Sequence, residues 1–266
     1  MIAKIPTPKG IGFLVALVLF ITSSCTKVDA GSGIRKENRV EVADFNKISY
    51  ELGGHLNFTQ SNQTQVTVNT TPEVMEALDV FVEDQTLYIK RKKGFNIIHQ
   101  DEITFNITDD DTYGIYTCGS GDVDANYDEN YHFQKHELKT SGSGDIIVDG
   151  LRATDQEARV HGSGDIIINS LYSTTSLAKI SGSGDIIYEN GNVHESQIDI
   201  SGSGNFQGFD WMAEQADVFC SGSGNGHVRV QQYLNAKISG SGNAFYKGFP
   251  ILAVSVSGSG DIFDAN

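Results

Sequence analysis

The sequence predicts an all-β protein whose main body is a parallel β-helix of about 20 residues per coil, preceded by an irregular N-terminal β cap. Three observations predict this fold. The phrase Ser-Gly-Ser-Gly-Asp recurs, with small variations, at a nearly fixed interval. Short stretches of alternating apolar and polar residues flank each copy. Residues 118–266 contain no stretch with a helical period.

The interval between copies sets the length of a coil. The copies begin at Cys118, Ser141, His161, Ser181, Ser201, Ser221, Ser239 and Ser257. The spacings are therefore 23, 20, 20, 20, 20, 18 and 18 residues. Propeller blades need about 40–50 residues, and leucine-rich repeats need a leucine frame that is absent here. A β-sandwich gives no reason for a fixed interval, so a stack of coils is the fold that remains.

Each repeat predicts three short strands. Before the phrase, apolar residues alternate with polar ones, as at Ala178 and Ile180. After it comes a second strand such as Asp-Ile-Ile-Val, and then a turn such as Asp149-Gly150. A third short segment carries Leu151, Leu171 or Trp211. Equivalent strands of successive coils are expected to pair about 4.8 Å apart.

The paired glycines of the phrase are predicted to form a structural corner. They have the same parity as the inward-facing residues on either side. Either the chain turns with a positive φ there, or it passes too close to its surroundings for a Cβ atom. The residues assigned to this corner are Gly142, Gly144, Gly162, Gly164, Gly182, Gly184, Gly202 and Gly204.

An export signal is predicted at the N-terminus. Lys4 and Lys9 form a positively charged start, and the apolar run Ile11–Ile21 is too short to span a bilayer. The Thr-Ser-Ser triplet before Cys25 resembles a bacterial lipobox. This predicts that residues 1–24 are removed by cleavage before Cys25 and that Cys25 is lipidated. The alternative is an ordinary signal cut nearby, with Cys25 an incidental thiol.

The net charge of the chain limits the classes of binding partner that the protein can have. The chain has a net charge of −15. Residues 1–24 hold two lysines and no acid, so the mature chain has 17 basic and 34 acidic residues, a net charge of −17. So acidic a surface argues against nucleic acid and against electrostatic docking on anionic lipid. It suits a soluble exterior held at a membrane by acyl chains.

The rest of the chain divides into a tether and a head. Residues 25–40 are polar and rich in Gly, Ser and Lys, which predicts a flexible tether. Residues 41–117 alternate like strands but lack the regular repeat, and 118–266 form the β-helix. The head is read as irregular starting coils, since a solenoid needs an atypical cap; a separate β layer is the alternative. One short helix is predicted from Pro72, with Thr71 as its cap.

No cofactor or metal is predicted. The Asp or Asn that ends each phrase forms a column from Asp122 to Asp261, which could bind a cation but is read as capping local backbone amides. His132 and His136 could chelate a metal on one strand face, but without a third ligand they are read as surface loop histidines. Cys118 and Cys220 lie about five coils apart, too far for a disulfide.

Other polar and aromatic groups are assigned structural roles. The run Lys90–Lys93 is read as a solvated turn, with phosphate binding as the alternative. Trp211 is read as a core residue, with a sugar-stacking platform as the alternative. Tyr188 and Tyr246 are read as a core ladder. No nucleophile with a partner base and no phosphate-binding loop is found, so no catalytic residue is assigned.

Several of these segments together resemble a known family. They are the lipobox, the strand Phe-Asn-Lys-Ile-Ser at 45–49, the strand Asp-Gln-Thr-Leu-Tyr-Ile at 84–89 and the recurrent Gly-Ser-Gly-Asp-Ile. Residues 40–266 are similar to the putative auto-transporter adhesin family with the head GIN domain, common in Bacteroidetes. The resemblance implies a right-handed, single-stranded β-helix in a cell-envelope protein. It supplies no catalytic residues.

The leading functional hypothesis is therefore a non-enzymatic envelope lipoprotein that acts as an adhesin-like binding module. It would be held at the membrane, with the outer membrane expected, by its N-terminal lipid, and would offer a solenoid face to a glycan or protein partner. The alternatives are a β-helix carbohydrate-active enzyme and a purely structural envelope module. A monomer is expected, because Asp261 and Asp264 would repel their copies in an end-to-end pairing. The alternative is that Ile262 and Phe263 recruit a second copy or a ligand strand.

Overall fold

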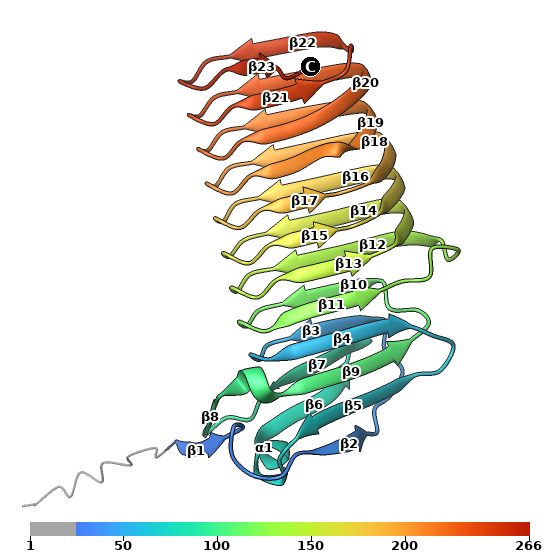
Figure 1. Cartoon of the computed structure of the whole chain (residues 1–266), viewed down its shortest axis with the longest axis vertical. Helices are drawn as coiled ribbons and strands as arrows, with labels where there is room; N and C mark the ends of the chain where they lie inside the picture. The colour runs from blue at the N-terminus through green and yellow to red at the C-terminus, as the bar shows by residue number, and fades with distance from the viewer. Residues whose placement is uncertain (1–24) are drawn as a thin grey trace, which may run out of the picture.

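The protein is a column of stacked coils, seen in a computed structural model that describes residues 25–266. Nearly all of its regular structure is β. The N-terminal head forms one end of the column and the C-terminal coil forms the other (Figure 1). The predicted parallel β-helix is confirmed. Within residues 25–266, none of the helices has the length and apolar character needed to cross a membrane.

Two strand families form the body, one on each side of the glycine-rich corner. The strands after the corner are β11 (Asp122–Asn126), β13 (Ile146–Asp149), β15 (Ile166–Ile168), β17 (Ile186–Tyr188), β21 (Ala244–Lys247) and β23 (Ile262–Asp264). The strands before it are β10 (Gly114–Thr117), β12 (Phe133–Thr140), β14 (Leu151–Val160), β16 (Leu171–Ile180), β18 (Gly191–Ile200) and β22 (Ile251–Val256). Strands β19 (Phe206–Cys220) and β20 (Gly226–Ile238) run through both sides. Equivalent strands of successive coils pair in parallel.

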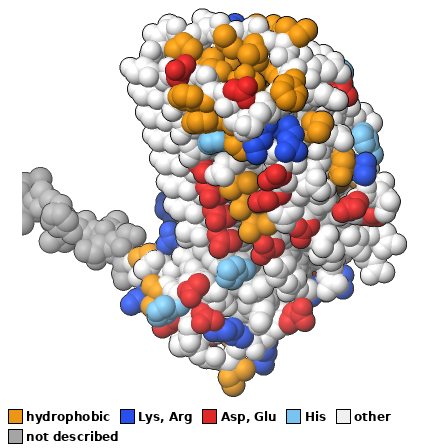
Figure 2. All heavy atoms as spheres, turned by 45° about the horizontal axis from the view of Figure 1, so that its top comes forward, with side chains coloured by type: hydrophobic (Ala, Val, Ile, Leu, Met, Phe, Trp, Pro, Cys, Tyr) orange, Lys and Arg blue, Asp and Glu red, His pale blue; other side chains and the backbone are white. Residues whose placement is uncertain are grey.

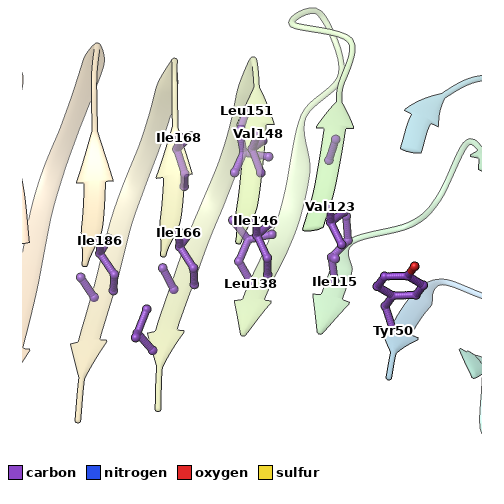
Figure 3. Close-up of a cluster of buried hydrophobic side chains, with 14 of the residues drawn as sticks. Tyr50, Ile115, Val123, Leu138, Ile146, Val148, Leu151, Ile166, Ile168 and Ile186 are labelled. Carbon is purple, nitrogen blue, oxygen red and sulfur yellow. The ribbon is translucent and has the colours of Figure 1, made fainter. Parts of the chain in front are cut away.

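In-register stacking turns each inward position into a column of the core. Ile146, Ile166 and Ile186 are register partners on successive coils, and all three are fully buried. Figure 3 shows these side chains at equivalent places on neighbouring strands. Because each coil covers the apolar residues of the one below it, the core is continuous along the column.

The bend between the third segment of a coil and the strand before the next phrase is gentler than the sequence suggested. The third segment and the strand before the phrase form one long strand, such as β14. Inward residues alternate from Leu151 to Ala153 and again from Gln156 to Val160, with two outward residues in succession at Thr154 and Asp155. The strand therefore bends there without losing its pairing to the next coil.

The head combines two further coils with an antiparallel cap. Its coils consist of β3 (Lys47–Tyr50), β4 (His55–Gln60), β7 (Thr86–Arg91) and β9 (Thr104–Asp109). Strand β3 pairs in parallel with both β10 and β7, and β4 pairs with both β11 and β9. The first coil in the chain therefore lies between the second and the third in space. The head contains both arrangements that the sequence left open.

The remaining elements close the end of the column. Strands β2 (Lys36–Val40), β5 (Gln65–Thr70) and β6 (Leu78–Glu83) pair antiparallel with their neighbours. The predicted helix is α1 (Pro72–Ala77), and the Thr71 hydroxyl accepts a hydrogen bond from the Val74 N–H. A 3-10 turn, η1 (Gln100–Glu102), precedes β9.

The segment expected to be a tether is ordered. Strand β1 (Thr26–Asp29) pairs with β8 (Phe95–Ile98), and β2 pairs with β5. Residues 25–40 therefore belong to the head. A polar, glycine-containing composition suggested flexibility, but pairing with strands distant in sequence holds the segment in place. The predicted signal peptide, residues 1–24, lies outside the described residues.

Candidate binding face of the solenoid

Close backbone approach, and not a positive φ, explains the glycine corner. None of the corner glycines has a positive φ. A Cβ built on Gly184 would lie 2.1 Å from the carbonyl oxygen of Gly164, and one on Gly164 would lie 2.0 Å from that of Gly144. The same overlap occurs at the first glycine, where Gly182 faces Gly162 at 2.0 Å. The glycines therefore form two columns in which each coil rests directly on the backbone of the last.

The Asp/Asn column is a hydrogen-bonded ladder. Each side-chain Oδ1 accepts the backbone N–H of its equivalent in the next coil at 2.6–3.0 Å, from Asp122 through to Asp261. The capped amide is therefore that of the neighbouring coil and not a local one. Burial, together with the charges of Asp145 and Asp185, raises the pKa of Asp165. No three His, Cys, Asp or Glu residues among 25–266 are placed to hold a metal ion.

An outward row of isoleucines runs beside this ladder. The row comprises Ile147, Ile167 and Ile187, which are register partners on β13, β15 and β17. Each is half-buried and points away from the core. We call it the isoleucine row. Figure 2 shows apolar side chains along this face with acidic side chains beside them. The signal for this row is the alternation of the strand: with Ile146 and Val148 facing the core, Ile147 faces outward.

Aromatic rings continue the same column toward the C-terminal end. Gln207 follows Ile187, and then come His227, Phe245 and Phe263, each paired with the next in register. The rings of His227 and Phe245 stack at 4.8 Å and 5°, and those of Phe245 and Phe263 at 5.1 Å and 19°. We call these three rings the aromatic row. Since their faces cover one another, they present mainly their edges to solvent.

A small hollow lies where the two rows meet. Its walls include Ile187, Glu189, Gln207, Phe209 and His227, and its volume is about 230 Å³. Sites for small molecules usually measure about 300–1,000 Å³. The hollow is therefore a shallow interruption in an extended face and lacks the size of an enclosed substrate pocket.

Acidic side chains form the rim of this face. The half-buried ladder residues Asp145, Asp165 and Asp185 lie along one side of the isoleucine row. On the other side, exposed Asp149 ends β13 and exposed Glu189 follows β17. The face thus has an apolar centre and an anionic border, the arrangement of a protein interface with a polar rim.

A network of paired acidic and basic side chains lies on the strands before the glycine corner. Glu137 accepts hydrogen bonds from Lys139 at 2.8 Å and Tyr116 at 2.6 Å, and it also contacts Lys135. Burial alone would raise the pKa of Glu137, but these bonds lower it to about 2. The basic groups here already have acidic partners, which identifies the network as structural.

The two histidines singled out in the sequence differ in their exposure to solvent. His132 is exposed and contacts the Thr154 hydroxyl at 3.0 Å. His136 is fully buried, against the rings of Tyr127 and Phe133, and so it is not the surface loop residue that was expected. Burial lowers its pKa to about 3. Because only one of the pair reaches solvent, the two do not form a chelating site.

Most of the other assigned residues lie in the core or at the surface as expected. Trp211 is fully buried against Tyr188 and Phe206. Tyr188 is buried and donates to Gln156 at 2.8 Å, whereas Tyr246 is only half-buried. In the Lys90–Lys93 run, Lys90 belongs to β7 and lies 4.7 Å from the ring centre of Phe81.

Cys118 and Cys220 form no disulfide with each other, in agreement with their predicted separation. Cys25, Cys118 and Cys220 are all free thiols. Cys220 is buried in the core, and burial raises the pKa of its thiol to about 11. A thiol in that environment is protonated at neutral pH and is not a nucleophile.

These features define a class: a β-solenoid that displays an extended apolar face bordered by acids. Residues 44–250 match the family described as putative auto-transporter adhesin, head GIN domain, and the chain belongs to that family. No curated protein sequence matches it.

Solved structures from Parabacteroides and Bacteroides species have the same fold. A putative lipid binding protein from Parabacteroides distasonis has a TM-score of 0.79 and 23% identity, covering 90% of this chain and 100% of its own. A putative adhesin from Parabacteroides merdae has a TM-score of 0.78 and 20% identity over the same shares. A putative adhesin from Bacteroides fragilis has a TM-score of 0.68 and 20% identity, over 88% and 98%. At these identities the likeness establishes the fold alone.

Proposed function

We propose that this protein is a non-enzymatic, lipid-anchored envelope protein that binds a protein partner on the side of its solenoid. The observation that carries the proposal is the outward column formed by the isoleucine row and the aromatic row, which Gln207 interrupts between Ile187 and His227. Soluble proteins seldom leave an extended apolar patch exposed unless something binds it. Membership of an adhesin family agrees with a binding role and with a place in the cell envelope.

A protein partner fits this face better than a glycan does. Sugar rings stack on the faces of aromatic side chains, but His227, Phe245 and Phe263 cover one another's faces. An apolar ridge between acidic borders suits a partner with an apolar strip and a basic rim. The small volume of the hollow beside Glu189 also favours surface docking over the alternative of a carbohydrate-active enzyme.

The proposed anchor is a lipid on Cys25. Strand β1 begins at Thr26, so a lipid on Cys25 would hold the head close to the membrane. The ten stacked coils would then carry the C-terminal end about 45 Å further out, at about 4.8 Å per coil. Mass spectrometry of the mature N-terminus should find a diacylglyceryl group on Cys25. Cys25→Ser should move the protein from the membrane fraction to the soluble fraction, and an unmodified N-terminus at another residue would contradict the anchor.

The binding face can be tested with the mature chain carrying Cys25→Ser. Arrays of extracellular proteins and of glycans would be probed in parallel. We expect a protein ligand, and we expect Ile167→Glu to weaken its binding at least tenfold by placing a charge in the middle of the isoleucine row. Ser163→Glu is the matched control, because Ser163 is exposed at the corner of the same coil. Equal loss in both variants, or binding to glycans alone, would contradict the proposal.

A further inference from the structure

A second hollow lies away from the isoleucine row, near the C-terminal end of the solenoid. Its volume is about 360 Å³, within the usual range for small-molecule sites of about 300–1,000 Å³. Met212 on β19, Arg229 on β20, Lys247 on β21 and Phe249 in the following turn contribute to its walls. We call it the Arg229–Lys247 pocket. Figure 2 shows basic side chains beside apolar ones toward this end of the molecule.

The two cations of the pocket are placed together without an acidic partner. Arg229 and Lys247 are register partners on adjacent parallel strands, so their backbones lie about 4.8 Å apart. Like charges in such positions repel. Among residues 25–266, neither forms an ion pair with a carboxylate. In contrast, Lys139 and Lys179, on the other strand family, both do.

This arrangement is unusual for so acidic a chain. The chain has a net charge of −15, yet in the described part, residues 25–266, no carboxylate pairs with Arg229 or Lys247. The Lys247 ammonium lies 4.4 Å from the ring centre of Phe209, which fixes its position but does not neutralise it. An anion in the pocket would relieve the repulsion and gain two charge-assisted hydrogen bonds.

The other half of the pocket is apolar and held in shape. Phe249 is 91% exposed and Met212 is 38% exposed. Gly248 has a φ of 99°, a conformation that favours glycine and sets the direction of the turn carrying Phe249. Its N–H donates to the Asn266 side chain at 2.9 Å, and that side chain donates back to the Gly248 carbonyl at 3.0 Å. The exposed ring is thus presented by a fixed turn.

We propose that the Arg229–Lys247 pocket binds an amphiphile with one anionic head group and an apolar chain. The head lies between Arg229 and Lys247, and the chain lies against Phe249 and Met212. Neither half alone accounts for the pocket: an inorganic anion would leave the apolar wall exposed, and an uncharged chain would leave the cations unpaired. The pocket lies beside the aromatic row, on the same two strands, but it would bind a different class of ligand, so the proposal goes beyond the proposed function.

Calorimetry on the mature chain with Cys25→Ser tests both halves. The probes are monododecyl phosphate below its micelle concentration, inorganic phosphate and dodecyl maltoside. We expect monododecyl phosphate to bind at least tenfold more tightly than either of the others. Equal binding of inorganic phosphate would reduce the pocket to an anion site, and equal binding of dodecyl maltoside would reduce it to an apolar patch. Either result, or no binding at all, would overturn the proposal.

Variants assign the binding to the pocket. Arg229→Gln/Lys247→Gln and, separately, Phe249→Ser should each weaken monododecyl phosphate binding at least tenfold. The matched control is Lys90→Gln/Lys93→Gln, which removes the same charge from the head and should bind like the wild type. Unchanged melting temperatures verify that all three variants fold, and Arg229→Gln alone serves if the double variant does not. Equal loss in the control would overturn the proposal. If the pocket variants still bind the protein partner, the pocket and the protein-binding face are distinct sites.

Discussion

At the scale of single residues, the corner glycines carry the strictest requirement in the molecule. In each coil the missing side chain is what allows two backbones to touch. At Gly184 the nearest obstacle is the Gly164 carbonyl oxygen, a backbone atom that cannot rotate away. The Ser183 N–H meanwhile donates to the Gly162 carbonyl at 2.9 Å, so a shift of the corner would also break pairing between coils.

Gly184→Val should therefore destabilise the protein by several kcal/mol, in the upper range of point-mutation effects of about 4–5 kcal/mol. Gly184→Ala should cost less but remain clearly destabilising, because even one Cβ overlaps the backbone below. Thermal unfolding followed by circular dichroism measures both. Ser183→Val, at an exposed neighbouring position, is the control. A melting temperature of Gly184→Val within a degree of the wild type would contradict the close-approach explanation.

His136 makes stability depend on pH. Its folded pKa is about 3, below the ordinary 6.5, because it is buried. The unfolded chain therefore binds a proton more readily, and stability is lost as the pH falls from about 6.5 toward 3. The full shift corresponds to roughly 4–5 kcal/mol at 1.36 kcal/mol per pH unit.

Replacing His136 should remove this dependence. His136→Phe keeps an aromatic ring against Tyr127 and Phe133 and deletes two buried ring nitrogens that have no hydrogen-bond partner. Urea unfolding between pH 6.5 and 5 should show a nearly flat stability for this variant and a falling one for the wild type. His132→Phe, at the exposed histidine, should keep the wild-type slope. Equal slopes in His136→Phe and wild type would refute the role of burial.

At the scale of elements, the Asp/Asn ladder shows how one side-chain type can link every coil. Asn205, Asn225 and Asn243 each donate from Nδ2 to the Oδ1 below at 3.1–3.2 Å, in addition to accepting the backbone N–H above. Aspartates in the lower coils can make only the second of these bonds. The asparagine rungs are therefore better paired than the aspartate rungs, which also repel one another.

Asp165→Asn should consequently stabilise the protein. Asn keeps the acceptor for the Asp185 N–H, adds a donor toward Asp145, and removes a charge from between two carboxylates. One added hydrogen bond contributes about 1 kcal/mol. Denaturant unfolding at pH 7 should show a gain of that order. Since the folded pKa of Asp165 is raised, the gain should shrink at acidic pH as the wild-type carboxyl takes up its proton. The converse change, Asn225→Asp, should destabilise.

At the scale of the whole molecule, the two ends of the column differ. The head end is closed by β2, β5, β6 and α1. In the last described coil, Leu252, Val254 and Val256 occupy inward positions of the core columns but are 43%, 53% and 44% exposed. Asp261 and Asp264 lie in the same coil and are exposed. Apolar strand residues with nearby acids are a combination that opposes edge-to-edge association.

We therefore expect a monomer whose association is limited by these charges. Asp261→Asn/Asp264→Asn should begin to associate, because the apolar residues remain while the repulsion is removed. Light scattering on sized samples at several concentrations measures this. Asp149→Asn/Glu189→Gln removes two charges from the side of the column and should stay monomeric. A stable wild-type dimer that dissociates on truncation after Gly260 would make the terminal coil an interface instead.

The sequence by itself determined the coil length, the inward columns and the corner. Each of these is local: a period-2 strand such as the one ending at Ile180 has only one face toward the core, and the repeat copies that face into every coil. The close-approach requirement at Gly184 was one of two explanations already visible in the residue type.

Tertiary structure decided what depends on contacts distant in the chain. The pairing of β3 with both β7 and β10 places the first coil out of sequence order. The pairing of β1 with β8 and of β2 with β5 orders residues that looked like a tether. Burial of His136 follows from the packing of Tyr127 against it. Arg229 and Phe249 meet only because a coil returns above its predecessor. The physical reason is the same in each case: composition describes a segment, whereas the free energy of its conformation is set by the neighbours that stacking brings to it.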